Sequence, residues 1–107
     1  MDKGLHRTIG HYRQSLEAMG IKVKRIILFG SCAAGRARTD SDLDLLVVSD
    51  DFRKMDLWER LSILGRARAD ISRPMEILGM TEREFMKRRE GGFLAEEVIA
   101  KGLVVPL

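Results

Sequence analysis

Apolar residues recur at spacings of four, three, four and three residues near the start of the chain, which is the pattern of one face of an amphipathic helix. Gly20 directly follows this segment and is a residue type that commonly ends helices. The pattern therefore predicts an N-terminal helix that packs on the rest of the protein through one stripe of side chains: Leu5, Ile9, Tyr12, Leu16 and Met19.

Two denser apolar runs come next, at residues 21–29 and 43–48, and both are typical of strands. The first run is strongest over residues 25–29, and Gly30 ends it. Ser31 is a suitable N-cap for a short helix that reaches about residue 35. The second run is apolar on both faces in its later half, so we expect this strand to lie in the centre of a sheet.

The second half of the chain alternates between helical and extended patterns. A helix is predicted over residues 53–69 and a short strand over residues 75–78, which contains Glu76. Thr81 and Glu84 have the spacing of a capping box, which predicts a further helix that stops at Gly91-Gly92. A last helix over 93–101 and a closing strand over 103–105 complete a fold of the α/β (α+β) class.

Length and composition restrict the class of protein. A chain of 107 residues forms one domain, residues 1–107. No apolar run approaches the roughly 18 residues of a membrane span. The first four residues lack the apolar segment of a signal peptide, and a single cysteine excludes an intrachain disulfide, so we expect a cytoplasmic protein.

The net charge of +3 and the pI of about 9.4 give a small basic excess. Acidic and basic residues alternate along the predicted helices, as in Arg83-Glu84. This alternation favours solvated helix faces over a nucleic-acid-binding stripe.

The most informative segment is Phe29-Gly30-Ser31, followed after ten residues by Asp42-Leu43-Asp44. Side chains alternate along a strand, so Asp42 and Asp44 project from the same face, close enough to share a divalent cation. A Gly-Ser turn that opens into a helix presents backbone N–H groups and a hydroxyl to a phosphate. The alternative is that Asp42 caps a turn and Asp44 is merely exposed. The combination of both halves favours phosphoryl or nucleotidyl transfer.

This segment resembles the Gly-Ser…Asp-x-Asp signature of the minimal nucleotidyltransferases of the DNA polymerase β superfamily. The resemblance implies a mixed β-sheet of about three to five strands with helices packed mainly on one side. It also implies metal-dependent transfer of a nucleoside monophosphate from a nucleoside triphosphate.

The same resemblance assigns roles to individual residues. Gly30 and Ser31 would hold the triphosphate, and Asp42 and Asp44 would coordinate two Mg²⁺ ions. Glu76 would be the third catalytic and metal-binding carboxylate, at a position where the family usually has Asp. The alternative for Glu76 is a solvated side chain on an edge strand.

The chain departs from the family pattern beside the Gly-Ser turn. Family members often have arginines at the positions of Cys32 and Ala34. Arg36 and Arg38 follow, and Arg36 is our candidate for the missing nucleotide-binding cation, although both could equally be solvated. We expect Cys32 to pack beneath the turn rather than to act as a reactive thiol.

Minimal nucleotidyltransferases of this type are typically paired with an all-helical partner of the HEPN class, often as antitoxin and toxin. The resemblance therefore implies transfer of AMP from ATP (AMPylation) to a hydroxyl on such a partner, with this chain as the antitoxin. Trp58, Phe93 and Leu94 are candidates for partner docking, although a core position is favoured for each.

Two alternatives stay open from the sequence. One is a binding module of weak or no catalytic activity that neutralises a helical partner by contact. The other, suggested only by the pI, is a nucleic-acid-binding accessory subunit. Self-association into a homo-oligomer is neither favoured nor excluded by the sequence.

Overall fold

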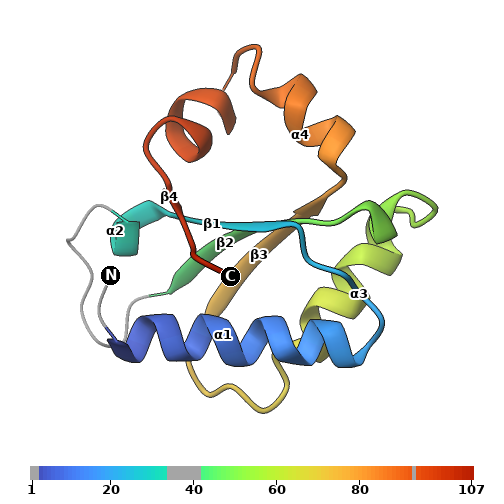
Figure 1. Ribbon diagram of the computed structural model, residues 1–107, viewed down its shortest axis with the longest axis vertical. Coiled ribbons are helices and arrows are strands. Elements are labelled where there is room, and N and C mark those ends of the chain that lie inside the picture. The colour runs from blue at the N-terminus through green and yellow to red at the C-terminus, as the bar shows by residue number, and fades with distance from the viewer. Residues whose placement is uncertain (1–2, 34–41, 93) are drawn as a thin grey trace.

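The computed structural model describes residues 3–33, 42–92 and 94–107. Four strands form one mixed sheet in the order β3-β2-β1-β4, as Figure 1 shows. The strands are β1 (Arg25–Phe29), β2 (Leu43–Val48), β3 (Met75–Met80) and β4 (Leu103–Val104). The helices are α1 (Lys3–Ala18), α2 (Gly30–Ala33), α3 (Leu57–Ala67) and α4 (Glu82–Arg88), with a 3-10 helix η1 (Asp50–Phe52) and a π-helix η2 (Leu94–Ile99).

β2 lies inside the sheet, as its two-sided apolar pattern predicts. It pairs antiparallel with β1 and parallel with β3, while β4 pairs antiparallel with the other edge of β1. This register places Asp44 opposite Phe29 on one side and opposite Glu76 on the other. The α/β fold with a mixed sheet is confirmed.

Helices cover both faces of the sheet (Figure 1). The two longest helices, α1 and α3, share one face, where Leu45 and Val47 of β2 belong to the larger core cluster. The shorter α4 and η2 cover the other face, where Leu46 packs with Phe85 and Val98. Most helical residues therefore lie on one side, as the family resemblance implies.

α3 begins four residues later than the predicted start at residue 53 because local caps divide the segment. The Ser49 side chain accepts a hydrogen bond from the Asp51 backbone N–H and starts η1. Asp56 then forms a capping box with Glu59 and fixes the first turn of α3. This Asp-x-x-Glu signal is visible in the sequence and was missed in our prediction.

The core position predicted for Trp58 is wrong, because its side chain is 76% exposed. α3 contacts the core through Leu64 and Ala67. A helix turns about 100° per residue, so Trp58 lies about 120° around the axis from Leu64 and faces solvent. Phe93 and the side chain of Leu94 lie outside the part of the chain that the structure describes.

The C-terminal third follows the prediction with two differences. The capping box of Thr81 and Glu84 is confirmed, and β3 extends two residues past its predicted end at residue 78. The last helix is a π-helix rather than an α-helix, and nothing in its local sequence explains this choice. Within the described residues, no helix has the length and apolar character needed to cross a membrane.

Gly10 offers a test of the stability of α1 as a helix. It lies in the middle of the helix, and a Cβ added there would meet no atom within 4 Å. Gly10→Ala should therefore raise the free energy of unfolding by about 0.5–1 kcal/mol, because alanine loses less backbone entropy in a helix. Urea denaturation followed by circular dichroism measures this change. Gly65→Ala in α3, where the added Cβ is equally unobstructed, should behave in the same way.

Candidate functional site

The corner between β1 and α2 is built on Gly30. This residue has φ +72°, a conformation that side chains other than glycine rarely adopt. A Cβ at this position would lie 2.2 Å from the Asp44 Oδ2 atom. The backbone of the Gly-Ser corner therefore packs directly against the Asp44 carboxylate, which joins the two halves of the sequence motif at one place.

Asp44 lies between the two other predicted acids. It is half-buried, whereas Asp42 and Glu76 are exposed. Burial is the largest of the effects that raise the pKa of Asp44, followed by the neighbouring charge of Glu76, a side-chain hydrogen bond with Glu76, and the charge of Asp42. The structure therefore brings the three predicted carboxylates into electrostatic contact.

Cys32 connects the Gly-Ser corner to the core and to the start of β2. Its side chain packs against the core cluster under α1, as predicted for a structural cysteine. The thiol donates to the Asp42 carbonyl oxygen at 3.4 Å, which ties α2 to the start of β2. This contact links the position of the Gly-Ser corner to that of the acidic strand.

Arg73 lies beside the candidate site and was not predicted from the sequence. It lies in the loop before β3, and its guanidinium is 3.6 Å from the Cys32 sulfur. A cation thus reaches the α2 corner from a segment some forty residues away in the chain. The only sequence signal was the Arg73-Pro74 break, which indicates a boundary and nothing about charge. Arg36 and Arg38, our predicted cations, lie outside the described residues.

The carboxylate oxygens of Asp42, Asp44 and Glu76 are ligands of the type that a hard divalent cation prefers, but the three side chains do not form a complete metal-binding site. In the part of the chain that the structure describes, no group of three or more His, Cys, Asp or Glu side chains is placed to hold a metal ion. Mg²⁺ is usually bound by one or two carboxylates together with water and substrate phosphates, so a complete protein cage is not required. Asp44 and its two acidic neighbours fit that donor set.

The burial of Asp44 beside two other acids, which we call its crowding, predicts a measurable effect on stability. A pKa raised in the folded state means that the contribution of Asp44 to stability is largest below its ordinary value of 3.8 and falls as the pH rises through the raised value. At pH 7 the charged Asp44 therefore destabilises the metal-free protein. Asp44→Asn should raise the thermal midpoint at pH 7 by about 2–4 °C and have little effect near pH 3.

Magnesium provides the control for this prediction. Millimolar MgCl₂ should raise the midpoint of the wild-type protein and leave Asp44→Asn nearly unchanged, as differential scanning fluorimetry would show. An Asp44→Asn variant that is less stable than the wild type at pH 7 without metal would contradict the proposed crowding.

Comparison with known proteins identifies the class. The chain matches the nucleotidyltransferase domain family over residues 10–100, and it belongs to that family. Members of this family generally use Mg²⁺. No match was found among curated proteins.

Two solved structures share the fold. One is a crystal structure of a toxin-antitoxin with AMP-PNP, with a TM-score of 0.62 and 18% sequence identity, covering 94% of this chain and 72% of the other. The second is described as a candidate nucleotidyltransferase from Sulfolobus solfataricus, with a TM-score of 0.57 and 18% identity, covering 97% and 86% of the two chains. At these identities the likeness concerns the fold.

Proposed function

We propose that this nucleotidyltransferase-family protein transfers AMP from ATP to a hydroxyl group on a partner protein. The observation that carries the proposal is the contact between the Gly30 corner and Asp44, with Glu76 beside Asp44 in register. A phosphate-binding corner placed against clustered carboxylates suits chemistry at a phosphorus atom.

The reaction is an in-line displacement. The acceptor oxygen forms a bond to the α-phosphorus of ATP, the bond from that phosphorus to the bridging oxygen breaks, and pyrophosphate leaves. The hydroxyl proton passes to a carboxylate, for which we propose Glu76. Its exposed position at the edge strand leaves it open to an incoming acceptor.

We propose that Asp42, Asp44 and Glu76 hold the Mg²⁺ that the family generally uses. Bound Mg²⁺ would neutralise charge on the phosphates and lower the pKa of the attacking hydroxyl. The raised pKa of Asp44, caused first by burial and then by its acidic neighbours, supports this assignment because a cation would relieve that crowding.

For the triphosphate we propose the backbone N–H groups of Gly30 and Ser31 as ligands. Arg36 is the cation inferred from the sequence. The guanidinium of Arg73 at the α2 corner is a second source of positive charge, which would offset the absence of the family's arginines at Cys32 and Ala34.

We further propose that the partner is a small all-helical HEPN-type protein and that this chain acts as its antitoxin. Support comes from the shared fold with the toxin-antitoxin structure that contains AMP-PNP.

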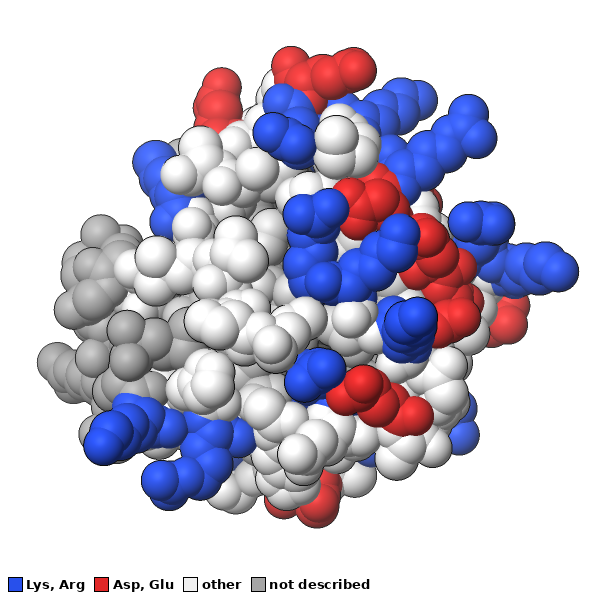
Figure 2. Space-filling model, viewed as in Figure 1, with Lys and Arg blue, Asp and Glu red and all other residues white. Residues whose placement is uncertain are grey.

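A second candidate is neutralisation of the partner by contact without transfer. It is favoured by the departure from the family pattern at Cys32 and Ala34, where family members often have arginines. Nucleic-acid binding has less support: Figure 2 shows acidic side chains interleaved with basic ones along the side formed by α4 and α3, rather than a single-sign surface.

The two candidates are separated by one experiment. The protein is incubated with Mg²⁺, the product of the neighbouring gene and ATP labelled at either the α- or the γ-phosphate. AMP transfer predicts label on the partner from the α-labelled nucleotide only. Tight binding of the partner with no incorporated label would favour neutralisation by contact and overturn the proposed activity.

A further inference from the structure

β3 forms one edge of the sheet, and no strand among the described residues pairs with its outer side. Pro74 and Met80 direct their carbonyl groups to β2, accepting from the Leu43 and Ser49 N–H groups. Backbone groups alternate in direction along a strand, so those of residues 75, 77 and 79 face away from the sheet. Such an edge is a template for a further strand.

Two arginines of the α3 region partly cover this edge. Arg68 donates to the Met75 carbonyl oxygen at 2.9 Å, and Arg60 to that of Gly79 at 3.5 Å. Among the described residues, the N–H and carbonyl groups of Ile77 make no hydrogen bond. The longer of the two arginine contacts is weak, so an incoming backbone N–H can replace it.

A groove of about 410 Å³ runs along the Met80 end of this edge, between α3 and α4. One wall is apolar and is formed by Leu57 and Leu61 of α3. The other carries Glu84 and Arg88 of α4. The apolar wall is accessible, since Leu61 is 42% exposed and Leu57 more so.

The charges of the groove indicate the chemistry of its occupant. Arg60 and Glu84 pair with each other at 2.7 Å. Arg88 makes no ion pair within the described part of the chain, so the groove has an excess positive charge. Pairing of β3 with β3 of a second copy would bring Arg60, Arg68 and Arg88 of both copies into one interface, which disfavours self-pairing. The charge of an acidic segment of another protein is complementary to the positive charge of the groove.

We propose that this groove binds an extended acidic segment of another protein, which adds to the sheet as a strand beside β3. Side chains of the added strand alternate between the two walls. Every second residue is apolar and contacts Leu57 and Leu61, and the residues between them are acidic and face Arg88.

The groove lies at the Met80 end of β3, and Glu76 is four residues away along the strand, or about 13 Å. A segment that pairs with Ile77 and Gly79 extends from the groove to the neighbourhood of Glu76. The inference does not rest on the proposed transfer, and binding can be measured without it.

The test uses a fluorescein-labelled peptide in which glutamate and valine alternate over about seven residues. We expect binding by fluorescence anisotropy, and we expect the analogue with lysine in place of glutamate to bind at least about fivefold more weakly. In the ¹⁵N spectrum of the protein, the Ile77 and Gly79 amide signals should shift on peptide addition and those of β4 should not.

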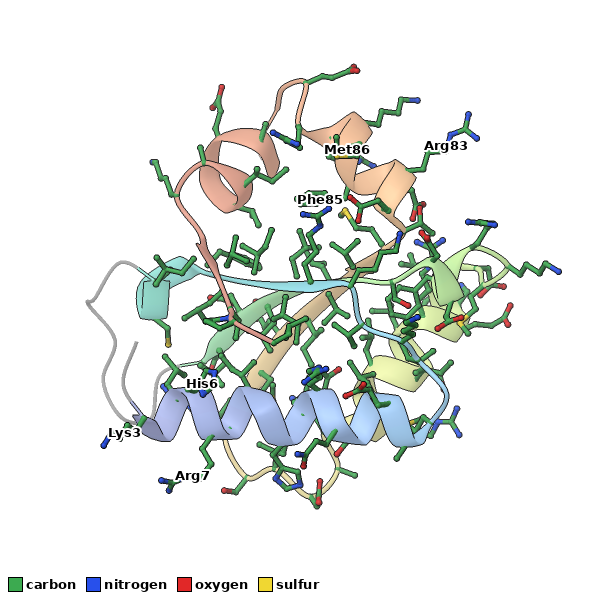
Figure 3. All side chains as sticks on the ribbon, viewed as in Figure 1. Lys3, His6, Arg7, Arg83, Phe85 and Met86 are labelled. Atoms are coloured by element: carbon green, nitrogen blue, oxygen red, sulfur yellow. The ribbon has the colours of Figure 1, made fainter. Side chains whose placement is uncertain are left out.

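Matched variants test the two walls. Arg88→Glu should weaken glutamate-peptide binding at least about fivefold and improve binding of the lysine peptide, whereas Arg83→Glu should not. Arg83 lies on the same helix but points away from the sheet, while Phe85 points toward it (Figure 3). Leu61→Ser should also weaken binding, whereas Leu103→Ser, at 41% exposure on β4, should have no effect.

The proposal is overturned if the glutamate peptide fails to bind at millimolar concentration, or if Arg88→Glu binds it as tightly as the wild type. It is also overturned if sedimentation shows a dimer that Leu61→Ser converts to a monomer, because the occupant is then a second copy. Circular dichroism of each variant confirms that the fold is retained.

Discussion

Asp44→Asn is expected to reduce AMP transfer to the partner protein by at least about 100-fold while the domain stays folded. The substitution keeps the shape of the side chain and removes the charge at the centre of the acidic cluster. Asp44 is the acid that contacts the Gly30 corner and whose pKa is raised, first by burial and then by Glu76, so it has the strongest structural case for a place in the reaction. Label transfer from α-labelled ATP under single-turnover conditions measures the loss.

The comparison with other acids gives this prediction its controls. Asp42→Asn should cause a loss of similar size, since the charge of Asp42 is close enough to raise the pKa of Asp44. Asp70→Asn should transfer AMP normally, because Asp70 is exposed and pairs with His11 of α1 rather than with the acidic cluster. Wild-type transfer by Asp44→Asn, with its fold confirmed by circular dichroism, would remove Asp44 from the proposed mechanism.

Gly30→Ala is expected to lower the free energy of unfolding by about 1–3 kcal/mol and to reduce AMP transfer at least about tenfold. Two separate costs combine at this position: the φ of +72° and the approach of the new Cβ to 2.2 Å from the Asp44 Oδ2 atom. The carboxylate must move to admit the methyl group. Urea denaturation and the transfer assay measure the two effects.

Two further variants separate the costs at Gly30. Gly20→Ala has a similar φ of +89° with no atom within 4 Å of the new Cβ, so it isolates the backbone cost. In an Asp44→Ala background the clash is absent, and Gly30→Ala should then cost about as much as Gly20→Ala. Equal costs of Gly30→Ala in both backgrounds would show that the corner and Asp44 are not in contact.

Helix faces and helix caps were predictable because they depend on interactions between residues that are close in the sequence. The stripe of Leu5, Ile9, Tyr12 and Leu16 in α1 and the capping box at Thr81 each depend on residues within one or two helical turns. Met19, which we predicted as the last residue of this stripe, is exposed because α1 ends at Ala18. The start of α3 was placed too early for the same kind of reason, since the competing caps at Ser49 and Asp56 were overlooked.

The site was predictable only in part. Gly30-Ser31 follows β1, and Asp42 and Asp44 lie at the start of β2, the next strand in the chain, which pairs antiparallel with β1. The sequence pattern predicts both of these strands. The placement of Glu76 beside Asp44 depends on a parallel crossover through α3, and no local pattern sets that register. Its catalytic role stays a prediction.

The sequence by itself determined the order of helices and strands, the central position of β2 and the meeting of a Gly-Ser turn with an Asp-x-Asp strand, because periodicity and short connections encode them. Only the tertiary structure decided that Trp58 faces solvent, that Arg73 reaches Cys32 and that the β3 edge lies beside a groove lined by Arg60 and Arg88. These features arise from packing between segments far apart in the chain. Their geometry is set by the relative positions of whole helices and strands, which no single stretch of residues specifies.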